Sequence, residues 1–255
     1  MIQEVKMLDH HTNKIIDVIM LAGKILLENG AETYRVEDTM TRIATHYGLD
    51  NTHSFVVPTA IIFSFSEKSE TRLMRIESRT TDLEKIAETN AISRAIASNS
   101  ITLDDAKTML QQLDQADLQF SLWLKALSAG LVSFFFLLMF DGTVIDLLPA
   151  FLAGSIGFLI GEYIQLHTRI KFFSEFAAAI VIASIAHLFV LQFAGDSINK
   201  IIIAGVMPLV PGVLITNAIR DLMASHLQAG IIKGVEAGLT AFAIGAGVAL
   251  CLTIY

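Results

Sequence analysis

The sequence predicts an α-helical integral membrane protein with about five transmembrane helices, preceded by a small cytoplasmic α+β domain. Two observations lead to this prediction. The 255 residues have a mean hydropathy of +0.59, and only 17% of them are charged. Residues 1–120 hold 12 of the 18 Lys and Arg and 18 of the 25 Asp and Glu. We therefore expect a soluble first half and a second half that lies in lipid.

The second half contains five apolar segments, each close to the length of about 20 residues that a helix needs to cross the hydrocarbon core. A soluble core large enough to bury five such segments is implausible for a chain of this size. The predicted domains are therefore a cytoplasmic domain over residues 1–117 and a transmembrane domain over residues 118–255. The predicted spans cover about 118–140, 143–165, 174–195, 199–220 and 231–254.

Basic residues in the loops between the spans predict the orientation. Arg169 and Lys171 lie in one loop and Arg220 and Lys233 in another, both on the side of the N-terminal domain. Loops rich in Lys and Arg face the cytoplasm. We therefore expect a cytoplasmic N-terminus and, after five spans, an outside C-terminus. The N-terminus shows no pattern of a cleavable signal peptide.

The first half predicts the element order ααβββαα, a compact α+β domain. Apolar residues at helical spacing, ended by Asn29-Gly30, predict the first helix. β-Prone residues predict the strands, and in the second strand Ile61, Phe63 and Phe65 alternate with polar positions. Two capping boxes, Thr81-x-x-Glu84 and Thr102-x-x-Asp105, are expected to open the last two helices. The predicted ranges are helices 8–29, 34–47, 82–98 and 103–116, and strands 52–57, 60–66 and 71–77.

The fourth apolar segment carries a double proline. It reads Met207-Pro208-Leu209-Val210-Pro211-Gly212. Each proline removes a backbone donor and disfavours helix in the preceding residue, so we expect the helix to break near mid-membrane. Broken backbone at that depth is tolerated only inside protein or beside a watery cavity, and in transporters it binds substrate or ions. A simple kinked helix is the alternative.

Polar residues follow this break. An ionisable group within a span is a functional candidate, because burying a charge in lipid is costly. The alternative is that Arg220, Asp221, Lys233 and Glu236 pair with one another at the cytoplasmic interface. The predicted substrate path consists of Pro208, Pro211, Gly212, Asn217, Arg220, Asp221 and Glu236.

Glycines at intervals of four occur in two apolar segments. This spacing lets helix backbones approach closely in lipid, although it is a weak signal by itself. Packing between helices explains both stripes without any further role. The residues assigned to helix packing are Gly157, Gly161, Gly230, Gly234 and Gly238.

The first half carries no recognisable catalytic or metal-binding motif. It lacks GxSxG, a P-loop, HExxH and a cysteine pair, so neither a metal nor a cofactor is expected. With a net charge of −7 and no basic stripe, nucleic acid is not an expected partner. Glu32, Arg35, Glu37 and Asp38 cluster at the start of the second predicted helix, where acids also suit the helix dipole.

Two groups of motifs resemble the threonine/serine exporter family. The stretch 22–37, which contains Gly30-Ala31-Glu32-Thr33-Tyr34-Arg35, resembles the opening of that family. Pro208-Leu209-Val210-Pro211-Gly212, followed by Asn217, Arg220-Asp221 and Gly234-Val235-Glu236-Ala237, resembles its later signature. The motifs occur in the family's order over nearly the whole chain. Gly30, Glu32 and Arg35 are accordingly assigned to a cytoplasmic-domain motif.

The resemblance implies an exporter of threonine and serine in the bacterial inner membrane, driven by the proton motive force, and not an enzyme. Single-chain members have about ten spans. This chain, with five, looks like the larger half of the two-component version, whose partner is a small membrane protein of about five spans. A homo-oligomer is a further possibility. Some two-component members are associated with succinate export, so a dicarboxylate is the alternative substrate.

The expected roles in transport follow from the polar residues near the break. Asn217 and the backbone of 208–212 would contact substrate, Arg220 would attract a carboxylate, and Asp221 or Glu236 would carry the coupling proton. Two alternatives remain open. One is a membrane-anchored protein whose cytoplasmic domain hydrolyses or senses a ligand. The other is a structural or regulatory membrane protein whose fourth span is tightly packed and has no cavity.

Overall fold

The computed structural model describes residues 2–65, 71–193 and 197–254. The chain divides into two compact units. Unit 1 comprises Met1–Gln119 and Leu214–Gly234, and unit 2 comprises Phe120–Val213 and Val235–Tyr255. Segment 214–234, which the sequence assigns to the end of one span, a loop and the start of the next span, thus packs with the N-terminal residues.

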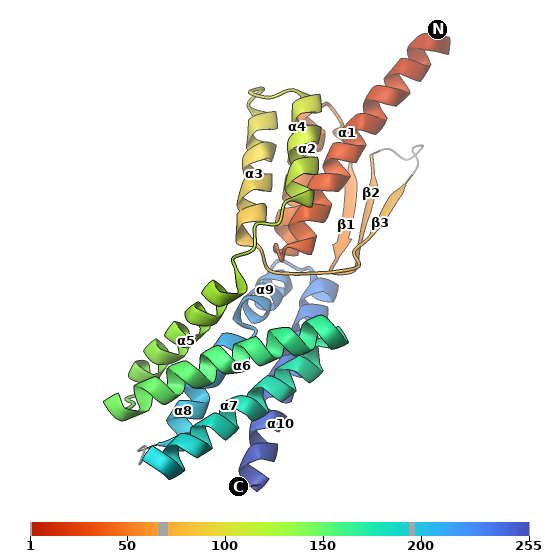
Figure 1. Cartoon of the computed structure of the whole chain (residues 1–255). Coiled ribbons are helices and arrows are strands. Elements are labelled where there is room, and N and C mark those ends of the chain that lie inside the picture. The colour runs from red at the N-terminus through yellow and green to blue at the C-terminus, as the bar shows by residue number, and fades with distance from the viewer. Residues whose placement is uncertain (1, 66–70, 194–196, 255) are drawn as a thin grey trace. The chain divides into compact units, whose positions relative to one another are not determined.

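The N-terminal part of unit 1 has the element order that the sequence predicts. Its helices and strands are α1 (Ile2–Glu28), α2 (Thr33–His46), β1 (His53–Val57), β2 (Ala60–Ser64), β3 (Arg72–Arg75), α3 (Leu83–Ala97) and α4 (Leu103–Gln115). α1 begins six residues before the predicted start. It packs against α2, α3, α4 and β2, so the core of the unit lies around this helix (Figure 1).

The turn after α1 ends the helix at the predicted place. The Ala31 N–H donates to the Leu26 carbonyl at 3.0 Å, and the Gly30 N–H donates to the Leu27 carbonyl at 3.3 Å. This pair of hydrogen bonds is the Schellman motif. Gly30 has a φ of +89°, which a residue with a Cβ adopts only with strain. The turn brings residues 30–33 to the end of α1, where α2 begins.

The three strands form an antiparallel sheet in the order β1-β2-β3. Ile61 of β2 lies opposite Val56 of β1 and Met74 of β3. Ile61 and Phe63 are buried, and the residues between and beside them are less so, which confirms the predicted alternation in β2.

The helix caps agree with the sequence in one case and differ in the other. Thr102 and Asp105 form the predicted capping box. The predicted cap at Thr81 is wrong, because Asp82 caps α3: its Oδ1 accepts from the N–H groups of Glu84 and Lys85, both at 3.1 Å. Aspartate is the stronger cap, so the helix begins one residue later than predicted.

The described part of unit 2 contains helices and no strand. It contains α5 (Leu122–Met139), a short 3₁₀ turn η1 (Val144–Asp146), α6 (Leu147–Thr168), α7 (Lys171–Phe193), α8 (Ile198–Val206) and most of α10 (Leu227–Ile254). α6 packs against α5, α7 and α8 (Figure 1). Small residues such as Ala150, Ala183 and Ala204 are fully buried there, so the helix backbones approach closely.

Four helices in the described residues are long and apolar enough to cross a membrane. They are Leu122–Met139, Val144–Thr168, Lys171–Gln192 and Leu227–Ile254. A bent pair, Ile198–Leu209 and Gly212–Met223, makes five if it counts as one span. The predicted multi-pass helical class with a small sheet is thus confirmed, at four or five spans.

The double proline interrupts the fourth span as predicted. α8 ends at Val206, a 3₁₀ turn η2 covers Met207–Leu209, and α9 (Gly212–Met223) follows at an angle of 62°. Val210, which precedes Pro211, is extended with φ −63° and ψ 127°, as the steric effect of a following proline requires. Two half-helices thus stand where the sequence predicts one span.

Candidate functional site

A cavity of about 580 Å³ lies in unit 2 beside the broken span. Two charged residues line it, Lys125 of α5 and Glu162 of α6, together with Ser128 and Pro208. Both charged residues are half-buried. The rest of the wall is apolar and consists of Phe120, Leu124, Ala129, Val132 and Phe158.

The chemistry of this wall is that of a site for a small zwitterion. An ammonium group attracts a carboxylate, and a carboxylate attracts an ammonium group, more strongly in a half-buried site than in water. Ser128 adds a hydroxyl that both donates and accepts hydrogen bonds. A mostly apolar cavity with a few polar groups is the usual form of a small-molecule site.

The predicted path residues lie in three different places. Pro208 lines the cavity, and Pro211 and Gly212 follow it at the start of α9. Glu236 is in α10 within unit 2. Asn217, Arg220 and Asp221 belong to unit 1, where they contact the turn between α1 and α2.

Asp221 forms the centre of a buried charged cluster in unit 1. Its carboxylate accepts hydrogen bonds from the Thr33 backbone N–H and hydroxyl, both at 2.9 Å, and from the Lys233 ammonium at 2.7 Å. The Asp221 side chain is fully buried and the Lys233 side chain is 5% exposed. Since Thr33 is the first residue of α2, Asp221 supplies a negative charge at that helix's N-terminus.

Further hydrogen bonds hold segment 214–234 to the same turn. Lys233 also donates to the Ala31 carbonyl at 3.3 Å, and the Asn217 amide donates to the Gly30 carbonyl at 2.8 Å. The charge of Asp221 is balanced and its oxygens are bonded. In physical terms this cluster is a structural clasp between the two motifs, which are about 190 residues apart in sequence.

Glu32 joins the two motifs a second time. It forms ion pairs with Arg220 and, at 3.2 Å, with Arg35. Burial raises the pKa of Glu32, but hydrogen bonds from its own backbone N–H and from Arg220, with the charges of both arginines, outweigh burial and lower the pKa below its ordinary value. Glu32 is therefore held as a carboxylate between two guanidinium groups.

Glu37 on α2 lies in a different electrostatic setting. Burial raises the pKa of Glu37 above its ordinary value, and the charge of His226 and a hydrogen bond from the Val56 N–H offset this only partly. The His226 ring nitrogen lies 3.8 Å from the carboxylate, an ion pair only when the ring is protonated.

In unit 2, α7 and α10 bring two acids and one base together. The Lys171 ammonium lies 3.1 Å from the Glu236 carboxylate. One turn further along both helices, Glu175 faces Thr240. The Glu175 Oε2 and the Thr240 hydroxyl are buried and have no partner within normal hydrogen-bond geometry among the described residues. The positive charge of Lys171 thus acts on the carboxyl groups of both Glu236 and Glu175.

The glycines of the packing assignment differ in how closely they are approached. A Cβ at Gly157 would lie 2.3 Å from Ile182 Cγ1, and a Cβ at Gly230 would lie 2.6 Å from Leu222 Cγ. These two positions therefore have no room for a larger residue. The nearest atoms to a Cβ would be 3.3 Å away at Gly161 and 4.0 Å at Gly234, and none lies within 4 Å at Gly238.

The sequence carried a signal for each site residue that was not predicted. Lys125 is the one charged residue inside the first apolar segment, Glu162 limits the second, and Glu175 borders the third. An isolated charge in an apolar segment is a functional candidate by itself. Which of them share a cavity depends on how α5, α6 and α8 pack, and this is not visible in one sequence. Among the described residues, no group of three or more His, Cys, Asp or Glu could hold a metal ion.

Comparison with known proteins gives one family. The family model described as "Putative threonine/serine exporter" matches residues 17–255. The "Probable threonine/serine exporter" of Mycobacterium tuberculosis is 22% identical over 88% of this chain and 43% of its own length. The "Probable succinate transporter subunit YjjP" of Escherichia coli is 26% identical over 91% of both chains.

A fungal relative extends the range of lengths. "Pheromone-regulated membrane protein 10" of Candida albicans is 26% identical over 93% of this chain but only 22% of its own length. The chain therefore spans less than half of the mycobacterial and fungal relatives and nearly all of the bacterial subunit. No solved structure matches.

Proposed function

The chain belongs to the threonine/serine exporter family, whose members are membrane transporters and not enzymes, and we propose that it exports threonine or serine as one subunit of a transporter. The observation that supports this most directly is the cavity beside Pro208, with Lys125 and Glu162 in its wall. The family membership sets aside a hydrolytic role for the N-terminal part.

The charges of the cavity favour an amino acid as the substrate. Lys125 would bind the carboxylate, Glu162 the ammonium group, and Ser128 the side-chain hydroxyl that threonine and serine share. A site that hydrogen-bonds a hydroxyl rejects an analogue without it, because its own polar group is then left unpaired. Pro208 places the broken backbone next to the bound solute.

Succinate is the second candidate, because the bacterial relative of matching length is named a succinate transporter subunit. The cavity argues against it. Glu162 would repel one of the two carboxylates, and Lys125 is the one basic residue in the wall. A dicarboxylate would thus have one favourable and one unfavourable charge contact.

Proton coupling is the second part of the proposal, and Glu236 and Glu175 are its candidates. Lys171 balances the charge of one carboxylate at a time, so the two carboxyl groups together offer a site for one exchangeable proton. Of the two acids named from the sequence, Asp221 is the less suitable candidate for carrying the proton, because its oxygens already accept hydrogen bonds from Thr33 and Lys233.

A small membrane protein of about five spans is the proposed partner, and a homo-oligomer is the alternative. The support is a comparison of lengths. This chain covers 91% of a relative that is itself named a subunit, but only 43% of the longer exporter. We further propose that the protein lies in a bacterial inner membrane with its N-terminus in the cytoplasm and its C-terminus outside.

The proposal is tested by measuring export of radiolabelled threonine from cells that express the full chain with its partner. We expect Lys125→Met and Glu162→Gln each to reduce the initial export rate by about tenfold or more, the loss of one charge-assisted contact. Lys200→Met is the matched control, because Lys200 lies outside the cavity and donates to the Asp141 carbonyl. Equal export by parent and both cavity variants, at equal membrane abundance, would refute the proposed site.

A further inference from the structure

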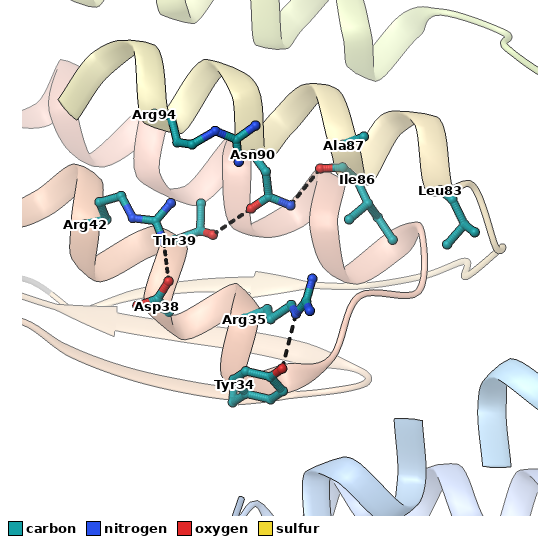
Figure 2. Close-up of a pocket in the computed structure, with 10 residues that line it drawn as sticks. All are labelled: Tyr34, Arg35, Asp38, Thr39, Arg42, Leu83, Ile86, Ala87, Asn90 and Arg94. Atoms are coloured by element: carbon teal, nitrogen blue, oxygen red, sulfur yellow. Dashed lines mark hydrogen bonds and ion pairs between the residues drawn. The ribbon is translucent and has the colours of Figure 1, made fainter. Parts of the chain in front are cut away.

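A second pocket, of about 610 Å³, lies in unit 1 between α2 and α3 (Figure 2). It takes no part in the transport site proposed above, and all its residues come from these two helices. Those of α2 are Tyr34, Arg35, Asp38, Thr39 and Arg42, and those of α3 are Leu83, Ile86, Ala87, Asn90 and Arg94.

Three guanidinium groups surround the pocket, and they differ in how they are paired. Arg42 forms an ion pair with Asp38. Arg35 lies 3.2 Å from a Glu32 carboxylate that also pairs with Arg220. For Arg94 the described residues contain no hydrogen-bond or ion-pair partner of the guanidinium group.

The lining of this pocket is positively charged, whereas residues 1–119 as a whole are negatively charged. Its lining carries three arginines and one aspartate, a formal charge of +2. Residues 1–119, to which it belongs, carry 12 basic and 18 acidic residues, a formal charge of −6. A solvated surface of this unit would on average be negative, so a local excess of positive charge indicates an anionic ligand.

The floor of the pocket is fixed, and one wall is apolar. The Asn90 side chain accepts from the Thr39 hydroxyl at 3.3 Å and donates to the Ile86 carbonyl at 2.8 Å. Figure 2 shows the three arginine side chains around this floor, with Ile86 and Leu83 on the α3 side. Leu83 is 64% exposed, so the pocket offers apolar surface that is not covered.

We propose that this pocket binds a phosphate monoester that carries an apolar or aromatic group. A phosphate monoester has a charge of about −1.5 to −2 at neutral pH, which matches the lining. Guanidinium groups bind phosphate oxygens with two parallel hydrogen bonds, and three arginines offer such donors from different directions. The organic group would lie against Leu83, Ile86 and Ala87. The volume is that of a small-molecule site.

The test is calorimetric titration of the purified full chain in detergent with phenyl phosphate, phenyl sulfate and inorganic phosphate. We expect saturable binding of phenyl phosphate. Phenyl sulfate, which has nearly the same shape and one negative charge, should bind about tenfold more weakly, and inorganic phosphate should also bind more weakly because it lacks the ring. Equal affinity for the sulfate and phosphate esters would contradict the proposal.

Variants locate the binding in the pocket. Arg94→Gln should weaken phenyl phosphate binding by about tenfold or more. Arg75→Gln, at an exposed arginine of β3 outside the pocket, should leave binding within about twofold of the parent. Arg42→Gln replaces Arg94→Gln if the latter does not fold. Absence of saturable binding, equal losses in the Arg94 and Arg75 variants, or association only with phosphatidylglycerol vesicles would overturn the proposal.

Discussion

Both units place charged residues on helices that are mostly apolar, but they leave these charges in different states. In unit 1, Asp221 and Lys233 are buried, balanced and fully hydrogen-bonded. In unit 2, Lys125 and Glu162 face a cavity, and Glu175 keeps a buried oxygen that has no partner among the described residues. The cost of burying a charge is offset by protein partners in the first case. In the second case the cavity gives a solute access to the charged side chains, which is the basis of the proposed transport site.

The position of a residue within a sequence motif does not by itself reveal its function. The residues after the double proline are polar like those of a transport path, but three of them hold the turn at residues 30–33 within unit 1. Apart from Pro208, the residues that line the cavity lie in less conspicuous segments. The surroundings of a polar residue in an apolar helix, and not its position in the sequence, thus distinguish a structural residue from a candidate transport residue.

The largest expected effect is the loss of the clasp in unit 1. Lys233→Met should destabilise the protein by about 3–5 kcal/mol, because it leaves the Asp221 carboxylate buried without its countercharge. The measurement is unfolding in increasing denaturant, monitored by the susceptibility of unit 1 to protease. The double variant Asp221→Leu with Lys233→Met should be less destabilised than Lys233→Met alone. A single variant as stable as the parent would show that the pair is not the buried clasp described here.

A smaller effect is expected where glycine lets two helices of unit 2 meet. Gly157→Ala should destabilise the protein by about 1–3 kcal/mol, because the new Cβ would lie 2.3 Å from Ile182, which is fully buried. Gly238→Ala is the matched control, since no atom lies within 4 Å of the new methyl group. Thermal unfolding in detergent measures both. Equal shifts in the two variants would contradict the packing of α6 on α7.

A still smaller effect on stability is expected for the ion pair of unit 2. Lys171→Met should cost less than about 1 kcal/mol, because the Lys171 side chain is 40% exposed and the pair is partly solvated. The same variant should change how threonine export depends on pH, as should Glu175→Gln and Glu236→Gln. Export measured between about pH 5.5 and pH 8 checks this. A pH profile identical to that of the parent in all three variants would remove this cluster from proton coupling.

The smallest effect is a dependence of stability on pH at Glu32. Its pKa in the folded protein is lower than the ordinary value of 4.5, so its contribution is fully present above that value and is lost as the pH falls through the folded pKa. Glu37 has the opposite sign, because its raised pKa favours the folded state below 4.5. We expect the difference in melting temperature between the parent and Glu32→Gln to shrink as the pH is lowered from about 6 to about 3. A constant difference would contradict the carboxylate state of Glu32.

Local signals in the sequence were sufficient to predict helix ends, a helix cap, the buried face of a strand and the broken span. Asn29-Gly30 ended α1, Thr102 and Asp105 capped α4, Ile61 and Phe63 predicted the buried face of β2, and the double proline predicted the broken span. Each of these depends on neighbours within a few residues, so a single sequence contains the information. For α3 the sequence predicted Thr81 as the cap, whereas the cap is the next residue, Asp82. Both residue types cap helices, so the error is one position.

Contacts between distant segments could not be predicted in this way. Thr33 and Asp221 are 188 residues apart, and nothing in the periodicity of either segment indicates that they meet. The same holds for Lys125, Glu162 and Pro208, whose shared cavity arises from three separate helices. The family resemblance marked both motifs around Thr33 and Asp221 as special, but it did not indicate that one binds the other.

Competition for threonine binding tests the zwitterion site most directly. Radiolabelled threonine is bound to the purified full chain together with the proposed small membrane partner. Unlabelled serine or succinate is then added, for the parent and for Glu162→Gln. We expect serine to displace threonine and succinate to fail in the parent. In Glu162→Gln, threonine should bind about tenfold more weakly and succinate should compete better, because the repelling carboxylate is gone. Succinate that displaces threonine from the parent as well as serine does, or unchanged threonine binding in Glu162→Gln, would contradict the proposed site.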